Sequence, residues 1–407
     1  MKLPGVAEKI SQKLKLRHKL RHSTGLQFAF AERVDFLNPA AWDSLAGGHG
    51  LFMSRDYLRA LETARMPELQ HRYAMVFGDG VPLVILSMQL LELGLDRLRP
   101  LARDQDEGES AAARLRQRVL VCGNLLTYGL DGVAFAPGLD PQLGWHAVAE
   151  ALYRIRRADK LQGGLQFVLV KDFDPARFAG SALLGKLSYS AIETEPNMIL
   201  ELAPGWKSHD DYLAGMTSKY RSNVKSRILK PLADAGYTVA PLAADEVARH
   251  AARMQQMYLA VQANASLRPL TVTPQFWPAM AALGAARAVI CGVTKDGELH
   301  GFLLVLKNGA EATAAQIGFD RELANAGLPL YLRLLHAGVA TAIAAGARQL
   351  IFGRTALEPK ARLGCKPVET HFWLRHRQPV INSVAKQFFH FIGHDEAPDI
   401  DPFKKAG

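Results

Sequence analysis

From about residue 28 onward, apolar stretches of strand length alternate with stretches that have helical periodicity. The runs 72–78 (RYAMVFG) and 81–90 (VPLVILSMQL) flank Asp79-Gly80, a pair that favours the positive φ angles of a two-residue hairpin turn. The polar stretch 101–118 is expected to be a loop or an exposed helix. The remaining sequence of this half predicts a strand at 119–123 and a helix at 145–158. It also predicts two apolar strands, at 165–170 and 198–202.

The second half of the chain repeats this order of elements. The runs 288–293 (AVICGV) and 299–306 (LHGFLLVL) flank a second hairpin signal, Asp296-Gly297. A long helix is expected over 330–345, because Pro329 stands where a helix start tolerates proline. The other predicted elements are a strand, a buried strand, a short helix or turn and a terminal strand, at 312–319, 348–353, 355–363 and 368–375. The repeated order predicts an α/β fold with mixed sheets in two tandem units.

The length and composition of the chain agree with two globular units. A chain of 407 residues exceeds what one ordinary core supports, so two domains are expected. With 49% hydrophobic and 22% charged residues, the composition is that of a folded protein. The expected division is a basic N-terminal extension, a first domain, a basic helical linker, a second domain and a tail, at 1–27, 28–202, 203–240, 241–380 and 381–407.

The formal net charge of +10 favours anionic partners such as a nucleotide cofactor, a lipid headgroup surface or a nucleic acid. Part of this charge lies in the first 22 residues, where seven lysines and arginines accompany Glu8 alone. Val6, Ile10 and Leu14 recur there at every fourth position. Two interpretations stay open for this segment: a short amphipathic helix on an anionic membrane, or a solvated extension.

Cysteine usage and hydropathy favour the cytoplasm. Cys122, Cys291 and Cys365 are odd in number and far apart, which suits a reducing compartment and does not form the spacing of a metal site. No apolar run approaches the roughly 20 residues that a membrane-spanning helix needs, and the N-terminus lacks the apolar core of a signal peptide. We therefore expect a cytoplasmic protein without a metal cofactor, with peripheral contact at the inner face of a membrane as the accompanying hypothesis.

Two segments of the second half resemble a known family. The motifs are Leu202-Ala203-Pro204, Tyr212-Leu213, Ser218–Lys225 and Gly236-Tyr237 in the linker, and Phe352–Thr355 through Lys360 to Leu363-Gly364 near the end. They resemble the tandem acetyltransferase-like proteins related to the peptidoglycan aminoacyltransferases, the FemAB-like group of the GCN5-related N-acetyltransferase (GNAT) superfamily. The resemblance covers roughly residues 200–378, whereas residues 30–199 share only the order of elements.

The resemblance implies two tandem GNAT-like acyl-CoA N-acyltransferase domains, with the active site in the second. In this family the central sheet opens, and the acyl donor lies in the opening with its pyrophosphate over the start of the next helix, where free N–H groups attract anions. Residues 319–329 form that connection here, so the implied cofactor-binding residues are Arg321, Ala326, Gly327 and Leu328. This chain departs from the family's phosphate loop, because it has a single glycine and Pro329 lacks an amide donor; an ordinary connection is the alternative.

The family's C-terminal motif places two basic residues at the opening. Ordinary members have a tyrosine four residues before a Gly-aromatic pair; here Lys360 stands there and Cys365 replaces the aromatic residue. Lysine in this segment is a mark of the FemAB-like subgroup, and an ammonium there can stabilise a developing negative charge or act as a general acid. Arg354 follows a buried strand, at the end where α/β folds gather their sites, and is a candidate for binding a substrate carboxylate or phosphate. Its alternative role is an ion pair with Glu358, and the alternative for Lys360 is a surface lysine.

Further candidates line the same presumed cleft. Glu358, Glu369, His371 and His336 are candidates for the general base, although His336 in the middle of a helix is better explained as a core or surface residue. Gln316 and Asp320 are candidates for orienting the acceptor.

The helical stretch 210–232 carries Lys219, Arg221, Lys225, Arg227 and Lys230. Of these, Lys219 and Arg221 are candidates for contacts with the acceptor or an anionic donor. A solvated face is the alternative.

Three functions remain in view. The first is transfer of an acyl group from acetyl-CoA or a longer acyl-CoA to an amine or hydroxyl of a small-molecule, cell-envelope or lipid acceptor. The second is a FemAB-like transferase that uses aminoacyl-tRNA on a cell-envelope precursor. The third is a non-catalytic binding protein that keeps the fold.

Overall fold

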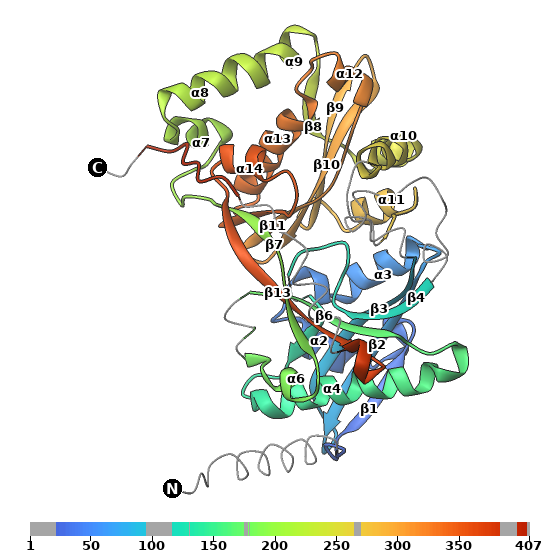
Figure 1. The fold of residues 1–407 in the computed structure, drawn as a ribbon. Coiled ribbons are helices and arrows are strands. Elements are labelled where there is room, and N and C mark those ends of the chain that lie inside the picture. The colour runs from blue at the N-terminus through green and yellow to red at the C-terminus, as the bar shows by residue number, and fades with distance from the viewer. Residues whose placement is uncertain are drawn as a thin grey trace, which may run out of the picture.

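The computed structural model describes residues 22–94, 116–129, 131–174, 178, 180–263, 270–382 and 397–404. Within these ranges thirteen strands form one continuous sheet that runs through two lobes (Figure 1). We call residues up to 201 the N-terminal half and the remainder the C-terminal half. The predicted amphipathic helix in the first 22 residues lies almost entirely outside the described residues.

The N-terminal half contains the strands and helices predicted for it. All described elements of this half are β1 Gln27–Ala31, α2 Pro39–Ala46, α3 Arg55–Thr63, β2 Leu69–Gly78, β3 Val81–Gly94, β4 Arg116–Cys122, β5 Val133–Phe135, α4 Pro141–Ala158, β6 Phe167–Phe173, α6 Leu183–Lys186 and β7 Ser190–Glu201, with 3₁₀ turns at Val34–Phe36, Leu51–Met53 and Asp159–Gln162. Of these, β1, α2, α3, β5, α6 and the 3₁₀ turns were not predicted. The Asp79-Gly80 turn joins β2 to β3 with φ angles of 50° and 80°, as the sequence predicts.

The C-terminal half repeats the plan. Its elements are α7 His209–Gly215, α8 Ser218–Val224, a π-helical turn Lys225–Leu229, α9 Lys230–Asp234, β8 Thr238–Pro241, α10 Ala244–Gln262, α11 Phe276–Ala281, β9 Ala288–Lys295, β10 Glu298–Asn308, β11 Glu311–Phe319, α12 Arg321–Asn325, α13 Leu330–Ala344, β12 Gln349–Gly353, α14 Leu357–Arg362 and β13 Lys366–His376. The second predicted hairpin is also present, because Asp296 and Gly297 turn the chain between β9 and β10 with φ angles of 52° and 81°.

One expected boundary is wrong. Residues 116–118 were expected within a loop or exposed helix, but they begin β4 and pair with β3. The charge of Arg118 is compatible with a strand because its guanidinium binds the buried Asp159 carboxylate, with Nη1 and Oδ2 2.9 Å apart. Residues 101–115, the rest of this polar stretch, lie outside the described residues.

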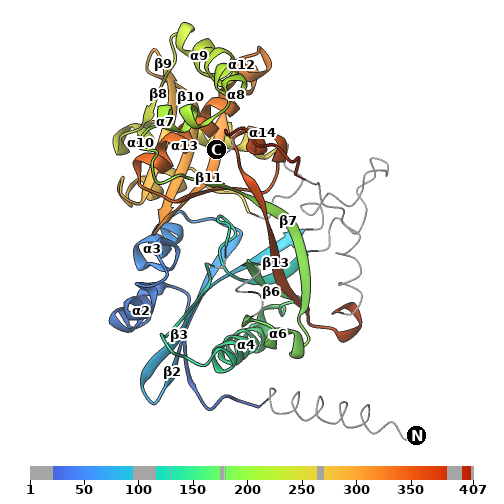
Figure 2. The ribbon, with the colours of Figure 1, turned by 90° about the vertical axis from the view of Figure 1, so that its left-hand side faces the viewer.

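The two halves exchange their last strands. β7, the final strand of the N-terminal half, pairs with β12 of the C-terminal half, where Leu200 lies opposite Leu350. β13, the final strand of the C-terminal half, pairs in turn with β6 of the N-terminal half, where Leu374 lies opposite Leu169. β7 and β13 also pair with each other and cross between the lobes (Figures 1 and 2). Each half therefore completes its sheet with a strand from the other.

Apolar side chains also join the halves away from the sheet. One buried cluster combines α2 and α3 with α10 and α11, through residues such as Trp42 and Tyr57 on one side and Phe276 and Trp277 on the other. Separate clusters lie beneath α4 and around α13. No helix in the described part of the chain is long and apolar enough to cross a bilayer.

Candidate active site

The sheet opens between β11 and β12. These parallel strands pair over three residues only, ending with Thr313 opposite Ile351, while β11 continues to Phe319. Just beyond that point β11 has a bulge: Val305 of β10 faces Ala314 and Leu304 faces Gln316, so Ala315 has no opposite residue. Bulges of this kind re-aim side chains and end strand pairing beside active sites. The opening lies where the family resemblance places the acyl donor.

A segment of the N-terminal half enters this opening. The Gln316 side-chain amide donates to the carbonyl of Leu126, with Nε2 and O 3.2 Å apart. The Tyr128 ring lies against Gly353 so closely that a Cβ added there would come within 2.2 Å of the ring. The Arg354 guanidinium carbon lies 5.8 Å from the centre of the same ring. Residues of the N-terminal half thus contact both β11 and the end of β12 beyond the point where these strands stop pairing.

Arg354 is held by a buried carboxylate from the N-terminal half. Its Nη2 lies 2.5 Å from Oδ1 of Asp172, whose other oxygen lies 2.6 Å from Nζ of Lys171. Burial by itself raises the pKa of Asp172, but the charges of Lys171 and Arg354 outweigh it, so the pKa lies below the usual value. Arg354 also donates to Oγ1 of Thr370 at 3.1 Å. The alternative partner Glu358 instead binds Arg362, 2.7 Å away at the surface.

Lys360 is buried beneath the end of β12, with only 4% of its surface exposed. Its ammonium donates to the carbonyls of Gly353 and Arg354, at 3.1 and 2.6 Å. Burial lowers its pKa to about 8. The surface-lysine alternative is therefore wrong for Lys360. The chain between Arg354 and α14 is strained, because Thr355 and Ala356 take positive φ angles of 66° and 47°.

The remaining acid–base candidates lie in different surroundings. Glu369 is exposed on β13, and Glu358 is exposed on α14. The His371 ring stacks on Phe178 with centroids 4.7 Å apart, and its Nδ1 is buried without a partner among the described residues. Of the two alternatives for His336, the core residue is the one found, because His336 is buried in α13 and its Nδ1 lies 3.1 Å from Nε2 of His209. Of these, only His371 presents a buried free ring nitrogen.

Gln316 and Asp320 differ in whether their side-chain oxygens have hydrogen-bond partners. Gln316 is largely buried, and its side-chain oxygen has no partner among the described residues. Asp320 accepts from the backbone N–H groups of Glu322 and Leu323 and binds Arg253, with Oδ2 and Nη2 2.7 Å apart. Gln316 is therefore free to contact a ligand, whereas Asp320 caps α12.

The connection between β11 and α13 contains the short helix α12. Gly327, at φ 99°, ends this helix in a Schellman motif: its N–H donates to the carbonyl of Ala324, and that of Leu328 donates to Leu323. The N–H of Ala326 donates to Glu322, and the Arg321 guanidinium lies 5.9 Å from the Phe319 ring centre. These four positions, the implied cofactor-binding residues, stay a prediction.

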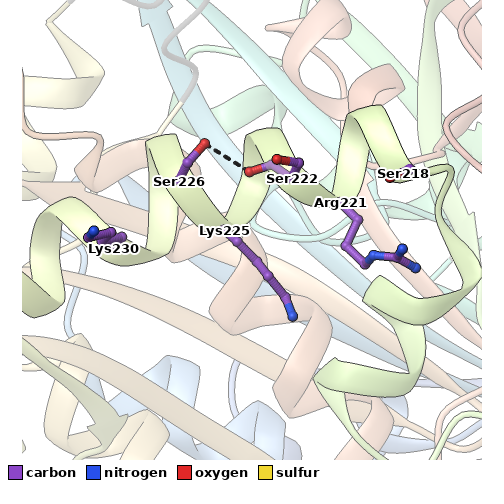
Figure 3. A pocket seen from close by; sticks show the side chains of 6 residues that line it. All are labelled: Ser218, Arg221, Ser222, Lys225, Ser226 and Lys230. Atoms are coloured by element: carbon purple, nitrogen blue, oxygen red, sulfur yellow. Dashed lines mark hydrogen bonds between the residues drawn. The ribbon is translucent and has the colours of Figure 1, made fainter.

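The basic helical stretch borders a groove of about 500 Å³. Figure 3 shows six lining side chains, which are Ser218, Arg221, Ser222, Lys225, Ser226 and Lys230. Arg221 and Lys225 extend to the same side of the helix in that view. Lys219, the other binding candidate on this helix, is exposed and does not line the groove.

The contribution of the N-terminal half to the site was not predicted from the sequence. Asp172 and Tyr128 contact Arg354, and Lys171 pairs with Asp172, yet none of these three residues was a candidate. A signal was present: Lys171-Asp172 directly follows the apolar run 165–170, and polar residues at the carboxyl ends of buried strands mark sites in α/β sheets. Among the described residues, no cluster of three or more His, Cys, Asp or Glu side chains is placed to hold a metal ion.

Comparison with known proteins identifies the fold. Residues 218–361 match the acetyltransferase (GNAT) domain family. The crystal structure of FemX superposes with a TM-score of 0.56 at 10% identity, covering 88% of this chain and 100% of that chain. A tandem GNAT protein from the clavulanic acid biosynthesis pathway superposes with a TM-score of 0.45 at 18% identity, covering 87% of this chain and 99% of that chain. L-PGS from Bacillus licheniformis superposes with a TM-score of 0.48 at 10% identity, covering 86% of this chain and 97% of that chain. No curated protein matches the chain in sequence. The two halves are tandem GNAT-like units, as the repeated element order predicts.

Proposed function

We propose that this chain, a GNAT-superfamily protein of the tandem FemAB-like type, transfers an acyl group from an acyl-CoA donor to an amine or hydroxyl of its acceptor. One observation carries the proposal: β11 and β12 part at a bulge, and Arg354 and Lys360 lie at the end of β12 beside that opening. The acceptor is a small molecule or a cell-envelope or lipid component, and the proposed compartment is the cytoplasm. The three cysteines are buried and free, which suits a reducing compartment.

Lys360 is suited to stabilise the charge that develops during transfer. An ammonium has three N–H donors, and two carbonyls take up two of them, which leaves one for a reacting atom. With a pKa of about 8, the cationic form predominates at neutral pH. When the acceptor nitrogen or oxygen attacks the thioester carbonyl, a bond to the acyl carbon forms, the acceptor loses a proton and the C–S bond breaks. The departing thiolate needs a positive charge until it takes up a proton, so that the net products are the acylated acceptor and a free thiol. Lys360 supplies either one from a site with little water.

Arg354 and Gln316 offer binding groups on the two sides of the opening. Nε of Arg354 and the side-chain oxygen of Gln316 are both buried without partners among the described residues. Buried polar atoms usually have partners, so these atoms are candidates for contacts with the donor carbonyl or the acceptor. Asp172 holds Arg354 in one orientation, which lets the site act by positioning the acceptor near the thioester.

The first test measures donor binding and turnover together. Isothermal titration with acetyl-CoA and longer acyl-CoAs is expected to show binding, and a thiol-release assay with a panel of amines and alcohols is expected to show turnover. Lys360→Met is expected to lower kcat more than tenfold, whereas the exposed Lys366→Met on β13 serves as a control with unchanged kcat. If no acyl-CoA binds, the acyl-CoA proposal is wrong.

A second candidate function is supported by the basic helix. Lys219, Arg221, Lys225, Arg227 and Lys230 gather on α8, the π-turn and α9, and this charge suits a polyanion such as aminoacyl-tRNA. In that case the donor would be a charged tRNA and the acceptor a cell-envelope precursor. Titration with charged tRNA at several salt concentrations separates the two, because many phosphate contacts give a steep salt dependence. A protein that binds no donor of either kind would instead be a non-catalytic binding protein.

A further inference from the structure

We propose that the groove along α8, the π-turn and α9 binds the phosphate groups of the acyl donor's nucleotide carrier, in place of the connection between β11 and α13. This inference rests on the proposed function, because it assigns the part of the donor that lies outside the opening between β11 and β12. The groove residues assigned to phosphate are Arg221, Lys225 and Lys230, with Ser218 and Ser222 as further hydrogen-bond donors.

The first observation is that residues 320–330 of the β11–α13 connection have few free backbone N–H groups, and the first turn of α13 adds only the amides of Tyr331 and Leu332. The N–H groups of Glu322 and Leu323 bind the Asp320 carboxylate, and that of Ala324 binds the Asp320 carbonyl. Those of 326, 327, 328 and 330 bind carbonyls within the same connection, and Pro329 has no N–H. A phosphate cradle needs several free N–H groups that converge on one point. Here the acidic side chain of Asp320 takes the place that an anion would occupy at the start of α12.

The second observation is that the cations of the groove have no acidic partner. Among the described residues, no ion pair or side-chain hydrogen bond engages Arg221, Lys225 or Lys230. Elsewhere in this half, Arg362 binds Glu358 and Arg253 binds Asp320. Like charges close together on one helix repel one another, so an anion bound between them is stabilised.

The third observation is a π-turn, which explains how Lys225 and Lys230 come to lie toward the same side of the helix. Pro231 lacks an N–H and would clash with the carbonyl four residues earlier in a regular helix. The chain instead makes a π-turn in which the N–H of Lys230 donates to the carbonyl of Lys225, five residues back. In an α-helix, a residue five positions on is rotated by about 140°, whereas a π-turn closes at that spacing and brings the two residues toward one side. Ser226 supports the local distortion by donating to the carbonyl of Ser222 at 2.8 Å (Figure 3).

The groove lies at the end of the C-terminal half where the β11–α13 connection also lies. In Figures 1 and 2, α8 and α9 stand together with α12 at the same end of this lobe. The opposite side of the basic helix is anchored, because Val224, Ile228 and Leu232 belong to the apolar cluster that also contains Leu330 and Leu334 of α13. The cations therefore project from a rigid wall beside the start of α13.

The chemistry of the groove favours a small ligand with several phosphates. All six lining residues lie on one helical stretch, so a ligand would lie along the surface of the helix. The lining contains cations and serines and no aromatic ring, so it does not offer the stacking surface typical of single-stranded nucleic acids. Three cations suit a diphosphate with a further phosphate monoester, as in coenzyme A.

The experiment compares two double variants that remove the same charge from the same helix. Arg221→Ala/Lys225→Ala changes the groove, and Lys219→Ala/Arg227→Ala changes cations outside it. The probes are coenzyme A, inorganic pyrophosphate and an S-acyl pantetheine that has the thioester arm without phosphates, each measured by isothermal titration. The groove variant is expected to weaken coenzyme A binding more than tenfold and abolish pyrophosphate binding, while pantetheine-thioester affinity stays unchanged. The control variant is expected to change coenzyme A affinity less than threefold.

Other outcomes would contradict either the groove site or the proposed function. Equal losses in both variants would show general electrostatic attraction and overturn the groove site. Unchanged coenzyme A binding in the groove variant would also overturn it, while binding of the pantetheine thioester would leave the proposed function in place. If neither coenzyme A nor the pantetheine thioester binds the unaltered protein, the proposed function itself fails. Tight binding of duplex RNA with a steep salt dependence, lost only in the groove variant, would replace the small ligand with a nucleic acid.

Discussion

Replacing Asp172 with asparagine tests whether the halves are held together by a buried charge cluster. Asp172 is 3% exposed and lies between Lys171 and Arg354, with N–O distances of 2.6 and 2.5 Å. Asparagine keeps the shape but leaves two cations facing one another without a counter-charge. Removing one partner from a buried ion pair costs about 3–5 kcal/mol. Because Arg354 is partly exposed, we expect the lower end of that range, about 3 kcal/mol.

A surface pair of similar geometry gives the matched control. Glu358 and Arg362 lie 2.7 Å apart with more than half of each side chain exposed, so Glu358→Gln is expected to cost less than about 0.5 kcal/mol. The losses are measured by urea unfolding followed by tryptophan fluorescence. If the free energy of unfolding falls by about 3 kcal/mol per M of urea, the midpoint shifts by about 1 M for Asp172→Asn and by less than about 0.2 M for Glu358→Gln. The distance between the charges is nearly the same in the two cases, so the difference measures the combined effect of burial and of the second cation beside Asp172.

Two results would contradict this reasoning. A midpoint shift for Asp172→Asn as small as that of the control would show that water screens the cluster. An equally low stability of Asp172→Leu/Lys171→Met/Arg354→Met would show that shape rather than charge is responsible, since an apolar replacement of the whole cluster is expected to recover most of the loss. The pH dependence has a fixed sign: the pKa of Asp172 is lowered, so its contribution is complete above its usual value and is lost as the pH falls below about 4.

Three further predictions follow from the same structure. The kcat/KM of the protein is expected to fall as the pH rises through about 8, because the Lys360 ammonium loses its proton, and Lys360→Arg should extend the plateau to higher pH; identical profiles would remove this charge from the mechanism. Gly353→Ala is expected to lower the melting temperature by several degrees, because φ is 74° and the new Cβ meets the Tyr128 ring, and adding Tyr128→Ala should restore part of it. Deleting residues 1–22 is expected to weaken cosedimentation with anionic vesicles without changing turnover, and unchanged partitioning would exclude the membrane helix.

Local chemistry explains what could be predicted from the sequence. The two Asp-Gly hairpins and the helix after Pro329 follow from preferences of neighbouring residues, and the structure has all three. The choice of Lys360 as a candidate, on the segment after β12, follows from a motif of the family. Predictions of this kind depend on a few consecutive residues, so they do not require knowledge of distant partners.

Features set by distant contacts escaped the sequence analysis. β7 was expected only at 198–202, because Glu193, Glu195 and Pro196 interrupt the apolar pattern of its first part. That part is nevertheless a strand because β13 pairs with it. Arg354 was assigned Glu358 as its alternative partner on sequence proximity, whereas its carboxylate comes from Asp172 in the other half. Periodicity along the chain cannot show which half supplies a strand or a counter-ion.

The order in which the strands are made has a consequence for biosynthesis. When β6 leaves the ribosome, the strand that will cover its edge, β13, has not yet been translated. At about 5–20 residues per second, the intervening chain takes roughly 10–40 s to synthesise. During that time β6 has an unpaired edge of a kind that associates readily with other strands. A nascent chain of this protein therefore needs protection of that edge until translation ends, and fragments cut between the halves would each retain an uncovered strand.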